Sequence, residues 1–420
     1  MKFVRKTFII VLAAMLVVAV GIAGCGAKEV RKTEDLQEKS WEEILAEARG
    51  TTVNFYGWGG DQRINKWLDE VVAPRLEDKY GIKLNRVGMD IDEILNKLLG
   101  EKQAGREKGS IDVVWINGEN FYTARRNELL FGPFTSMLPN FQKYVDPDDP
   151  EVKNDFGHPI EGYEAPYGRA QFVLTYDSAR LPESEVPKDH RALLELAKKY
   201  PGRITYPAPP DFTGSAFIRN IICDVVGREK LEGLDPGDKK AVEEAISPAI
   251  EYMRELKPFL WKKGESYPAT LAQLHNMFAD GEILISMDYA PYAAAGKVKT
   301  GEFPAMVRSF VFEKGTLGNT HYLAIPFNAP NKAGALAFIN YILSPEVQAS
   351  KNDPVNWGDL PVIDFNRLSP EEKKLFEDIN LGDAALPGDY LQARRLAEPD
   401  ASLIPVIEEI WVEKVLKEGK

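Results

Sequence analysis

The clearest pattern of apolar and polar positions lies near the start of the chain, where a β-branched and aromatic run ends in a glycine-rich turn. The run covers residues 51–57, and the only large side chain of the turn is Trp58. Apolar residues then recur at helical spacing over 64–72, with Asp61 as the candidate N-cap. The pattern predicts strand, loop and helix, and ligands of open α/β sheets bind beyond such strand ends.

The same alternation of strand and helix continues after this unit. Short apolar runs over 82–87 and 111–116 predict two more strands, and the spacing over 90–99 predicts a helix between them. Strands that alternate with helices form a parallel sheet. The third strand ends in a polar turn that contains Asn117 and Glu119, so two strand ends present loops at one edge.

A second set of elements follows a Pro-Tyr-Gly segment at 166–168, which we interpret as a crossing into a second lobe. The expected elements are an extended run at 170–176, a helix at 190–199, a strand at 203–206 and a helix at 216–226. Thr213 or Ser215 is expected to cap that last helix. Free amides at its start favour a polar or anionic group.

The last third of the chain adds a further acidic and aromatic loop. An apolar strand at 283–287 leads into Asp288, Tyr289 and Tyr292. The later elements expected are an extended segment at 321–326, a helix at 331–343, a loop that carries Trp357, and an amphipathic helix over 404–415.

The N-terminus has the features of a secretory signal peptide. Basic residues precede an uncharged run over 8–20, and small residues lead to Cys25. A cysteine at this point resembles a bacterial lipobox, so we expect a signal peptide at 1–24, lipidation of Cys25 and a polar tether over 25–45. The alternative is an uncleaved membrane anchor. Either places the body outside the cytoplasm, attached to the bacterial cell membrane.

Charge and cysteine content narrow the range of functions. Cleavage before Cys25 removes three basic residues and no acidic ones, which moves the net charge from −12 to about −15. So acidic a protein lacks the basic surface that nucleic acid requires. Cys223 is the only other cysteine, and we expect it to be a small buried apolar residue.

Several separate segments resemble extracellular solute-binding proteins of ABC importers, in the group of polyamine, thiamine and ferric-ion binders. They are the lipobox and the strings YGWGGD (56–61), DVVWIN (112–117), AIPFNAPNK (324–332) and AFINYILSPE (337–346). The string PGRITYPAPPDFTG (201–214) is similar to the YnjB branch in particular.

The resemblance implies a type II periplasmic-binding-protein fold, with two α/β lobes, helices on both faces of each sheet, and crossover strands between them. It implies an N-terminal lobe over 46–166 and 307–345, and a C-terminal lobe over 167–306 and 346–420. It also implies that hinge closure traps a small solute between the lobes for delivery to ABC permease subunits. We expect a monomer with no cofactor.

The candidate ligand-binding residues gather in the loops named above, where carboxylates recur beside aromatic rings. They are Trp58, Asp61, Asn117, Glu119, Thr213, Ser215, Asp288, Tyr289, Tyr292 and Trp357. Aromatic faces attract cations, and a carboxylate compensates the buried charge. We therefore expect an organic cation or zwitterion, such as a thiamine- or polyamine-like amine.

Three alternatives to an organic cation remain: an anion or sugar as the ligand, a metal ion as the ligand, and an enzyme instead of a binding protein. The helix start at Thr213 and Ser215, together with Arg169, would suit an anion instead. Import of a sugar is a further alternative. A metal is disfavoured because the four histidines are dispersed. No nucleophile elbow, zinc motif or P-loop indicates an enzyme, although a secreted carbohydrate-active enzyme would need only two carboxylates facing each other in space.

Overall fold

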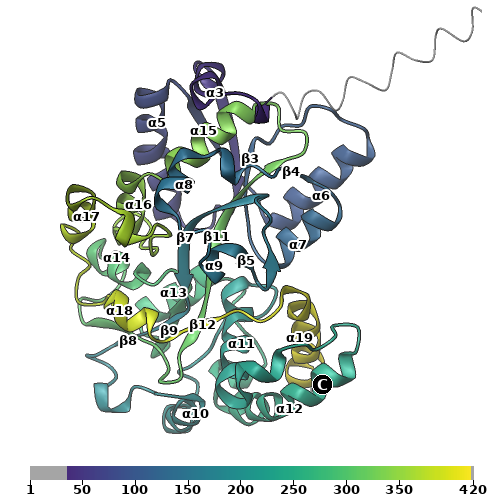
Figure 1. Ribbon diagram of the computed structural model, residues 1–420. Helices are drawn as coiled ribbons and strands as arrows, with labels where there is room; N and C mark the ends of the chain where they lie inside the picture. Colours follow the sequence, from purple (N-terminus) through teal and green to yellow (C-terminus); the bar gives the residue numbers. More distant parts are fainter. Residues whose placement is uncertain (1–35, 418–420) are drawn as a thin grey trace, which may run out of the picture.

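The structure is a computed structural model that describes residues 36–417. The expected signal peptide, the lipidation site at Cys25 and residues 25–35 of the expected tether lie outside this range. Residues 41–45 of that tether are instead part of a helix, Trp41–Ala48, whose Ile44 is buried in the core of the first lobe, so this lobe begins before residue 46. Within the described range, no helix has the length and apolar character needed to cross a membrane. The described chain folds into two α/β lobes, drawn one above the other in Figure 1.

The N-terminal lobe is built on a seven-stranded mixed sheet. Its main order is β12-β11-β3-β1-β2, and β4 and β7 also pair with β11. The strands are β1 (Thr52–Gly57), β2 (Lys83–Gly88), β3 (Val113–Ile116), β4 (Leu130–Phe131), β7 (Glu164–Gln171), β11 (Thr316–Pro326) and β12 (Arg395–Ala397). β1 runs parallel to β2 and β3, as the alternating pattern predicts. Both β1 and β3 therefore end at the same edge.

Helices surround this sheet, and Figure 1 shows them in the upper half of the molecule. They are α3 (Trp41–Ala48), α4 (Gln62–Lys66), α5 (Ala73–Tyr80), α6 (Ile91–Gln103), α7 (Glu119–Arg126), α8 (Pro139–Tyr144), α9 (Pro150–Lys153), α15 (Lys332–Ile342), α16 (Pro345–Asn352) and α17 (Pro370–Glu377). A π-helical segment, Trp67–Val72, joins α4 to α5. The small hairpin β5 (Asn154–Asp155) and β6 (His158–Pro159) lies beside α9.

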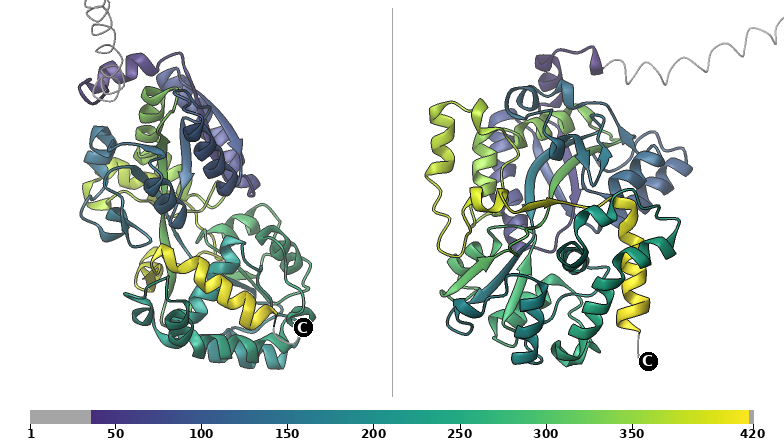
Figure 2. Two further views of the ribbon diagram at one scale, coloured as in Figure 1. Left: turned by 90° about the vertical axis from the view of Figure 1, so that its right-hand side faces the viewer. Right: turned by 60° about the horizontal axis from the view of Figure 1, so that its bottom comes forward.

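The C-terminal lobe has a small antiparallel sheet in the order β10-β8-β9, made of β8 (Val173–Asp177), β9 (Ile285–Asp288) and β10 (Val307–Phe310). Its helices are α10 (His190–Lys199), α11 (Phe212–Val226), α12 (Lys239–Leu256), α13 (Leu271–Ala279), α14 (Ala293–Lys299), α18 (Gly388–Gln392) and α19 (Ile404–Trp411). A π-helical turn, Val412–Leu416, extends α19. The two lobes also stay distinct in the rotated views of Figure 2.

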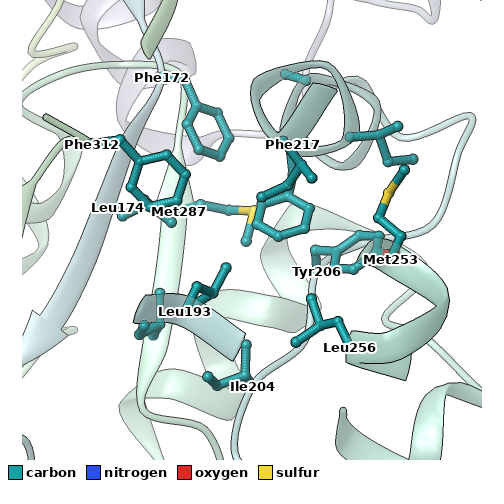
Figure 3. Packing of buried hydrophobic residues seen from close by; sticks show 14 of the residues in the cluster. Phe172, Leu174, Leu193, Ile204, Tyr206, Phe217, Met253, Leu256, Met287 and Phe312 are labelled. Carbon is teal, nitrogen blue, oxygen red and sulfur yellow. The ribbon is translucent and has the colours of Figure 1, made fainter. Parts of the chain in front are cut away.

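Each lobe has its own hydrophobic core. In the C-terminal lobe, Phe172, Phe217, Tyr206 and Met287 pack together from four separate segments (Figure 3). Trp411 of α19 joins the same core, with its indole Nε1–H donating to the Tyr206 hydroxyl at 3.1 Å. The amphipathic pattern of the last helix therefore correctly marks its buried face.

The path between the lobes differs from the expected bounds at two places. β10 pairs with β8, so 307–310 belong to the C-terminal sheet and the return to the first lobe begins with β11. Residues from Val347 to Phe376 pack in the core of the N-terminal lobe. The expected assignment of 346–420 to the other lobe fails there, because α16 and α17 pack together beside α15.

One expected strand is absent from the described chain. The backbone at 203–206 is extended but forms only single hydrogen bonds, with Arg203 O accepting from Leu284 N at 2.8 Å and Ile204 O from Trp261 N at 2.8 Å. Prolines at 207, 209 and 210 lack the N–H groups that a ladder needs. The segment therefore crosses the lobe without joining a sheet.

Candidate functional site

A cavity of about 370 Å³ lies between the two lobes; we call it the cleft cavity. The N-terminal lobe contributes the loop after β1 and the start of α4: Trp58, Gly60, Asp61, Gln62 and Arg63. The C-terminal lobe contributes α13, α14 and the loop after α14: Leu271, Ala272, His275, Asn276, Ala279, Lys297, Glu302 and Phe303. Its volume is in the range of small-molecule sites.

Trp58 is the aromatic residue that the cleft cavity presents to solvent. Its side chain is 43% exposed, so the ring is not packed in the core of either lobe. The glycine spacing explains this position. A Cβ at Gly60 would overlap the indole, and a Cβ at Gly59 would lie 3.1 Å from the Gly88 Cα. The loop therefore holds the indole over bare backbone at the end of β1.

Asp61 and Arg63 form the charged part of the same loop. Asp61 caps α4 by accepting from Arg63 N at 2.7 Å and Ile64 N at 3.3 Å, and its second oxygen pairs with Arg63 Nη2 at 2.9 Å. Burial by itself would raise the pKa of Asp61, but the positive charges of Arg63 and Lys297 and the hydrogen bonds from Arg63 lower it by more. The pKa of Asp61 is therefore lowered. Arg63 Nη1 donates to Ala293 O at 3.2 Å, which links the lobes directly.

The opposite wall of the cleft cavity carries a second ion pair and a histidine. Lys297 Nζ lies 3.1 Å from Glu302 Oε2. His275 Nε2 lies 3.4 Å from Asp288 Oδ2, beneath the cavity surface. The lining therefore holds two carboxylates, Asp61 and Glu302, and two cations, Arg63 and Lys297. Each lobe contributes one carboxylate and one cation. Such a lining has little net charge but can bind a ligand with two opposite charges.

A second group of charges is buried in the C-terminal lobe; we call it the arginine cluster. Arg219 of α11 donates to Glu398 through Nε at 2.9 Å and Nη2 at 3.1 Å, with both side chains at most 2% exposed. Arg219 Nη1 also donates to Ser215 Oγ at 2.6 Å, which donates to Glu408 at 2.5 Å. The Tyr289 hydroxyl donates to Glu398.

Glu119 brings the N-terminal lobe to this cluster. It begins α7 just after β3, where the sequence predicts a polar loop. Burial raises the pKa of Glu119, Arg219 opposes this shift, and the carboxylates of Glu408 and Glu398 add to it. These couplings join Glu119 to charges of the opposite lobe. The end of β3 therefore faces the C-terminal lobe, as the end of β1 does.

The loop before Glu119 is held from behind by a buried carboxylate. Gly118 has a φ of 58°, which a glycine adopts freely, and its N–H donates to Asp155 Oδ2 at 2.5 Å. Asn117 Nδ2 donates to Thr320 O on β11 at 3.3 Å. Burial raises the pKa of Asp155 well above its usual value, as do the nearby carboxylates, with the Gly118 hydrogen bond opposing.

Glu164 on β7 is a second buried carboxyl group, and its lack of described partners makes the stability of the protein depend on pH. It is fully buried, and within residues 36–417 neither carboxyl oxygen has a hydrogen-bond partner. Burial raises the pKa of Glu164 far above normal, Asp155 adds to the shift, and Arg125 opposes it. The native state therefore keeps a proton that the unfolded chain releases, so stability falls as pH rises above about 4.3, the unfolded value.

Replacing Glu164 with Gln removes this titration. We expect Glu164→Gln to raise the free energy of unfolding by about 1–3 kcal/mol at pH 8 and to change it little at pH 4. Urea unfolding at the two pH values measures the difference. The control is Glu161→Gln, an exposed residue in the same part of the chain that pairs with Arg125. Equal effects at both pH values would contradict the assignment.

Several expected site residues do not line the cleft cavity. Trp357 is 1% exposed and packs against Trp67, Trp115, Tyr167 and His321, with ring centroids 5.1–5.8 Å away. Tyr292 is buried with Val173, Val311 and Leu391. Both are packing residues in this structure. The polar neighbours of Trp357 in the sequence suggest a surface loop, but the aromatic cluster is assembled from distant segments.

A buried ion pair lies against the same aromatic cluster. Lys351 Nζ pairs with Asp359 and lies 3.9 Å from the Trp357 ring centroid. His321 Nδ1 lies 3.1 Å from Asp359. Next to Asp359, Leu360 exchanges backbone hydrogen bonds of 2.8 and 2.9 Å with Arg169 on the crossover strand β7. The pair therefore braces the strand that joins the lobes.

The start of α11 also differs from its prediction. Asp211, rather than Thr213 or Ser215, is the N-cap, and it accepts from Thr213 N and Gly214 N at 3.0 Å each. A carboxylate of the chain thus occupies the amides that would hold an anion. Thr213 is buried behind this cap, and Ser215 belongs to the arginine cluster. The argument for an anion from free amides therefore fails.

The sequence predicted some of the residues that meet between the lobes and missed others. Trp58 and Asp61 line the cleft cavity, and Glu119, Ser215 and Tyr289 meet at the arginine cluster. Arg63, His275, Lys297 and Glu302 were not predicted. Only Arg63, two residues after the cap, had a local signal. Within residues 36–417, no cluster of three His, Cys, Asp or Glu residues could hold a metal ion.

Comparison with known families and proteins gives consistent results. Residues 71–365 match the family model described as bacterial extracellular solute-binding protein. Protein YnjB of Escherichia coli K12 is 35% identical over 376 residues, which cover 89% of this chain and 93% of YnjB. The putrescine-binding periplasmic protein PotF of the same organism is 28% identical, covering 73% and 77%.

Solved structures agree at the level of the fold. The crystal structure of an ABC transporter substrate-binding protein from Bradyrhizobium japonicum has a TM-score of 0.62 to this chain, with 20% identity, and the match covers 87% of this chain and 99% of that one. At 20% identity this similarity supports the two-lobed α/β fold and does not identify the solute.

Proposed function

The chain belongs to the bacterial extracellular solute-binding proteins, and from this premise we propose that it captures an organic cation or zwitterion between its lobes for an ABC importer. The family model describes extracellular solute-binding proteins, and the relative PotF is named as a putrescine-binding periplasmic protein, so the chain is a solute-binding protein and not an enzyme. What we propose beyond this assignment is the charge of the solute and the identity of the residues that bind it.

The observation that carries the proposal is the lining of the cleft cavity. An exposed indole at Trp58 lies at the same cavity as the carboxylates of Asp61 and Glu302. An ammonium group over an indole face gains about 0.5–2 kcal/mol, and a carboxylate supplies its counter-charge. Arg63 and Lys297 at the same cavity can pair with an anionic group at the other end of the solute.

The balance of charges favours a zwitterion within this class. Each carboxylate of the cavity already pairs with a cation, Asp61 with Arg63 and Glu302 with Lys297. A simple cation would have to compete with these pairs for a carboxylate. A solute that carries both signs can insert into a pair and satisfy both partners at once. Among the relatives, PotF is named for binding putrescine, which supports an amine.

The experiment is a thermal-shift screen of the mature domain. The panel holds thiamine and its phosphates, polyamines, choline-type amines, amino acids, sugars, small anions and ferric ion. A ligand at a hundred times its dissociation constant stabilises the native state by about 2.7 kcal/mol, which is a readable shift. Shifts with amines or zwitterions support the proposal. Shifts with anions or sugars alone would contradict the solute class while leaving the family assignment intact.

Trp58 provides the direct test of the site once a stabilising solute is found. We expect Trp58→Ala to weaken its binding about tenfold, because a stacking contact worth about 1.4 kcal/mol is lost. Unfolding should change by only about 0.5 kcal/mol, since the ring is exposed. Calorimetric titration and urea unfolding measure the two quantities.

The matched control for Trp58 is Phe365→Ala. Phe365 is 42% exposed and belongs to the N-terminal lobe, but it does not line the cleft cavity. Its loss should leave binding unchanged. If Trp58→Ala lowered the melting temperature strongly and left affinity intact, Trp58 would be a packing residue and the site would lie elsewhere.

We also propose that Cys25 is lipidated and anchors the protein outside the cytoplasm, where it delivers solute to its permease. The lipobox-like sequence supports this. Cys25→Ala should move the protein from the membrane fraction to the soluble fraction of cells. Retention of the variant in the membrane would favour an uncleaved N-terminal anchor instead.

A further inference from the structure

A second pocket lies on the N-terminal lobe, away from the cleft cavity; we call it the surface pocket. Its volume is about 280 Å³, at the small end of the range for ligand sites. Five helices contribute to it, α3, α5, α8, α16 and α17, together with the end of α15, and Figure 1 shows them gathered in the upper part of the molecule. None of its lining residues lines the cleft cavity.

The charged residues of the surface pocket, Lys79, Glu346 and Glu372, already have polar partners in the protein. Lys79 Nζ lies 2.5 Å from Glu346, across α5 and α16. Glu372 accepts from the Tyr144 hydroxyl at 2.5 Å and from the N–H of Ser369, its own helix cap. The pocket thus presents little unpaired charge to a ligand. It therefore suits a neutral molecule.

One neutral polar group of the pocket, in contrast, is buried without a partner among residues 36–417. Ser344 Oγ is buried and has no hydrogen-bond partner within the described chain. The Asn340 side chain is buried, and its oxygen accepts from Asn140 N at 2.7 Å. Trp41 is half-buried and lines the same pocket. A buried hydroxyl such as that of Ser344 usually has a partner in the protein or in a bound molecule.

The remaining surface of the pocket is aromatic. Trp41, Tyr80 and Tyr144 line it from three different helices, and Tyr80 packs edge-on against Tyr341 behind it, with ring centroids 5.7 Å apart. Lys79 Nζ lies 5.7 Å from the Tyr80 ring centroid, and Lys143 Nζ lies 4.4 Å from that of Tyr144. Aromatic rings beside neutral polar groups match the apolar faces and hydroxyl edges of a sugar ring. The small volume disfavours an extended chain.

We propose that the surface pocket binds a neutral saccharide ring. The ring packs on the aromatic side chains, and its hydroxyls accept from Asn340 and Trp41 and pair with Ser344. This site is separate from the solute site between the lobes, and it does not depend on which solute that site takes. Trp41 is the first residue of α3 and lies within the segment 25–45 that was expected to form the tether.

The test is a titration of the chain from residue 26 onward with glucose, maltose and N-acetylglucosamine at millimolar concentration. Selective ¹⁵N labelling of tryptophan gives one indole signal for each Trp, and Trp41→Phe assigns the signal of Trp41. We expect a saturable shift of the Trp41 signal with at least one saccharide, and no shift of the Trp58 signal. Movement of the Trp58 signal alone would place the sugar in the cleft cavity and overturn the proposal.

Variants then separate the pocket from the fold. Tyr80→Phe keeps the ring and removes one hydroxyl, and it should weaken saccharide binding several-fold. Trp41→Ala should weaken it about tenfold or more. Trp58→Ala is the control and should leave saccharide binding unchanged. No shift of the Trp41 signal with any of the three saccharides would overturn the proposal, and that result would not bear on the solute screen.

Discussion

Arg219→Met should lower the free energy of unfolding by about 3–5 kcal/mol, because it leaves Glu398 buried without its counter-charge. Both side chains are almost fully buried and joined by two hydrogen bonds. Met fills much of the volume of the arginine stem, so the loss reports the charge more than a cavity. Glu408 and Glu119 lie near the same position and would add to the repulsion.

Urea unfolding measures this effect, with Arg228→Met as the matched control. Arg228 follows α11, forms an i,i+4 pair with Glu232 and donates from Nε to Ala397 O at 3.0 Å, but both contacts are exposed. Such pairs contribute about 0.2–0.5 kcal/mol. The double variant Arg219→Met with Glu398→Gln should lose less than Arg219→Met alone, since it removes both charges. A double variant as unstable as the sum of its parts would show that packing, and not charge, dominates.

Asp359→Asn should have an effect of similar size, about 3–5 kcal/mol, by leaving the buried Lys351 ammonium unpaired. Burial lowers the pKa of Lys351, and Asp359 opposes this shift. Without the carboxylate the lysine must lose its proton or remain charged beside aromatic rings. A cation over the Trp357 face regains part of this energy, which distinguishes the site from an apolar cavity.

The matched control is Asp148→Asn, whose carboxylate pairs with Lys153 at the surface and is 84% exposed. It should change stability by less than about 1 kcal/mol. Because Leu360 is bonded to the crossover strand, Asp359→Asn should also speed hydrogen exchange at the amides of Arg169 and Leu360. Unchanged exchange there would show that the pair stabilises the lobe without bracing the hinge.

Local pattern was sufficient for most of the helices and strands, because these are set by nearby residues, whereas the two-lobed fold was implied by the family resemblance. The run ending at Trp58 gave β1 and its loop, and the cap at Asp61 gave the start of α4. The apolar spacing near the C-terminus gave the buried face of α19. Each of these depends on period, capping or glycine, which act within a few residues.

The site was less predictable, because its partners come from distant segments. Glu398 lies 179 residues from Arg219, and no local signal marks that pairing. Trp58 and Trp357 both stand beside glycine and a carboxylate in the sequence, yet one is exposed at the cavity and the other is enclosed by four rings. Only tertiary packing separates these two cases.

The buried thiol of Cys223 has a practical consequence for measuring solute capture. Burial raises the pKa of Cys223 to about 12, so this thiol stays protonated and unreactive at neutral pH. A protein that begins after Cys25 therefore accepts a thiol-reactive fluorophore only at a cysteine placed by design. Gln62→Cys at the rim of the cleft cavity would turn the molecule into an optical sensor for its own solute.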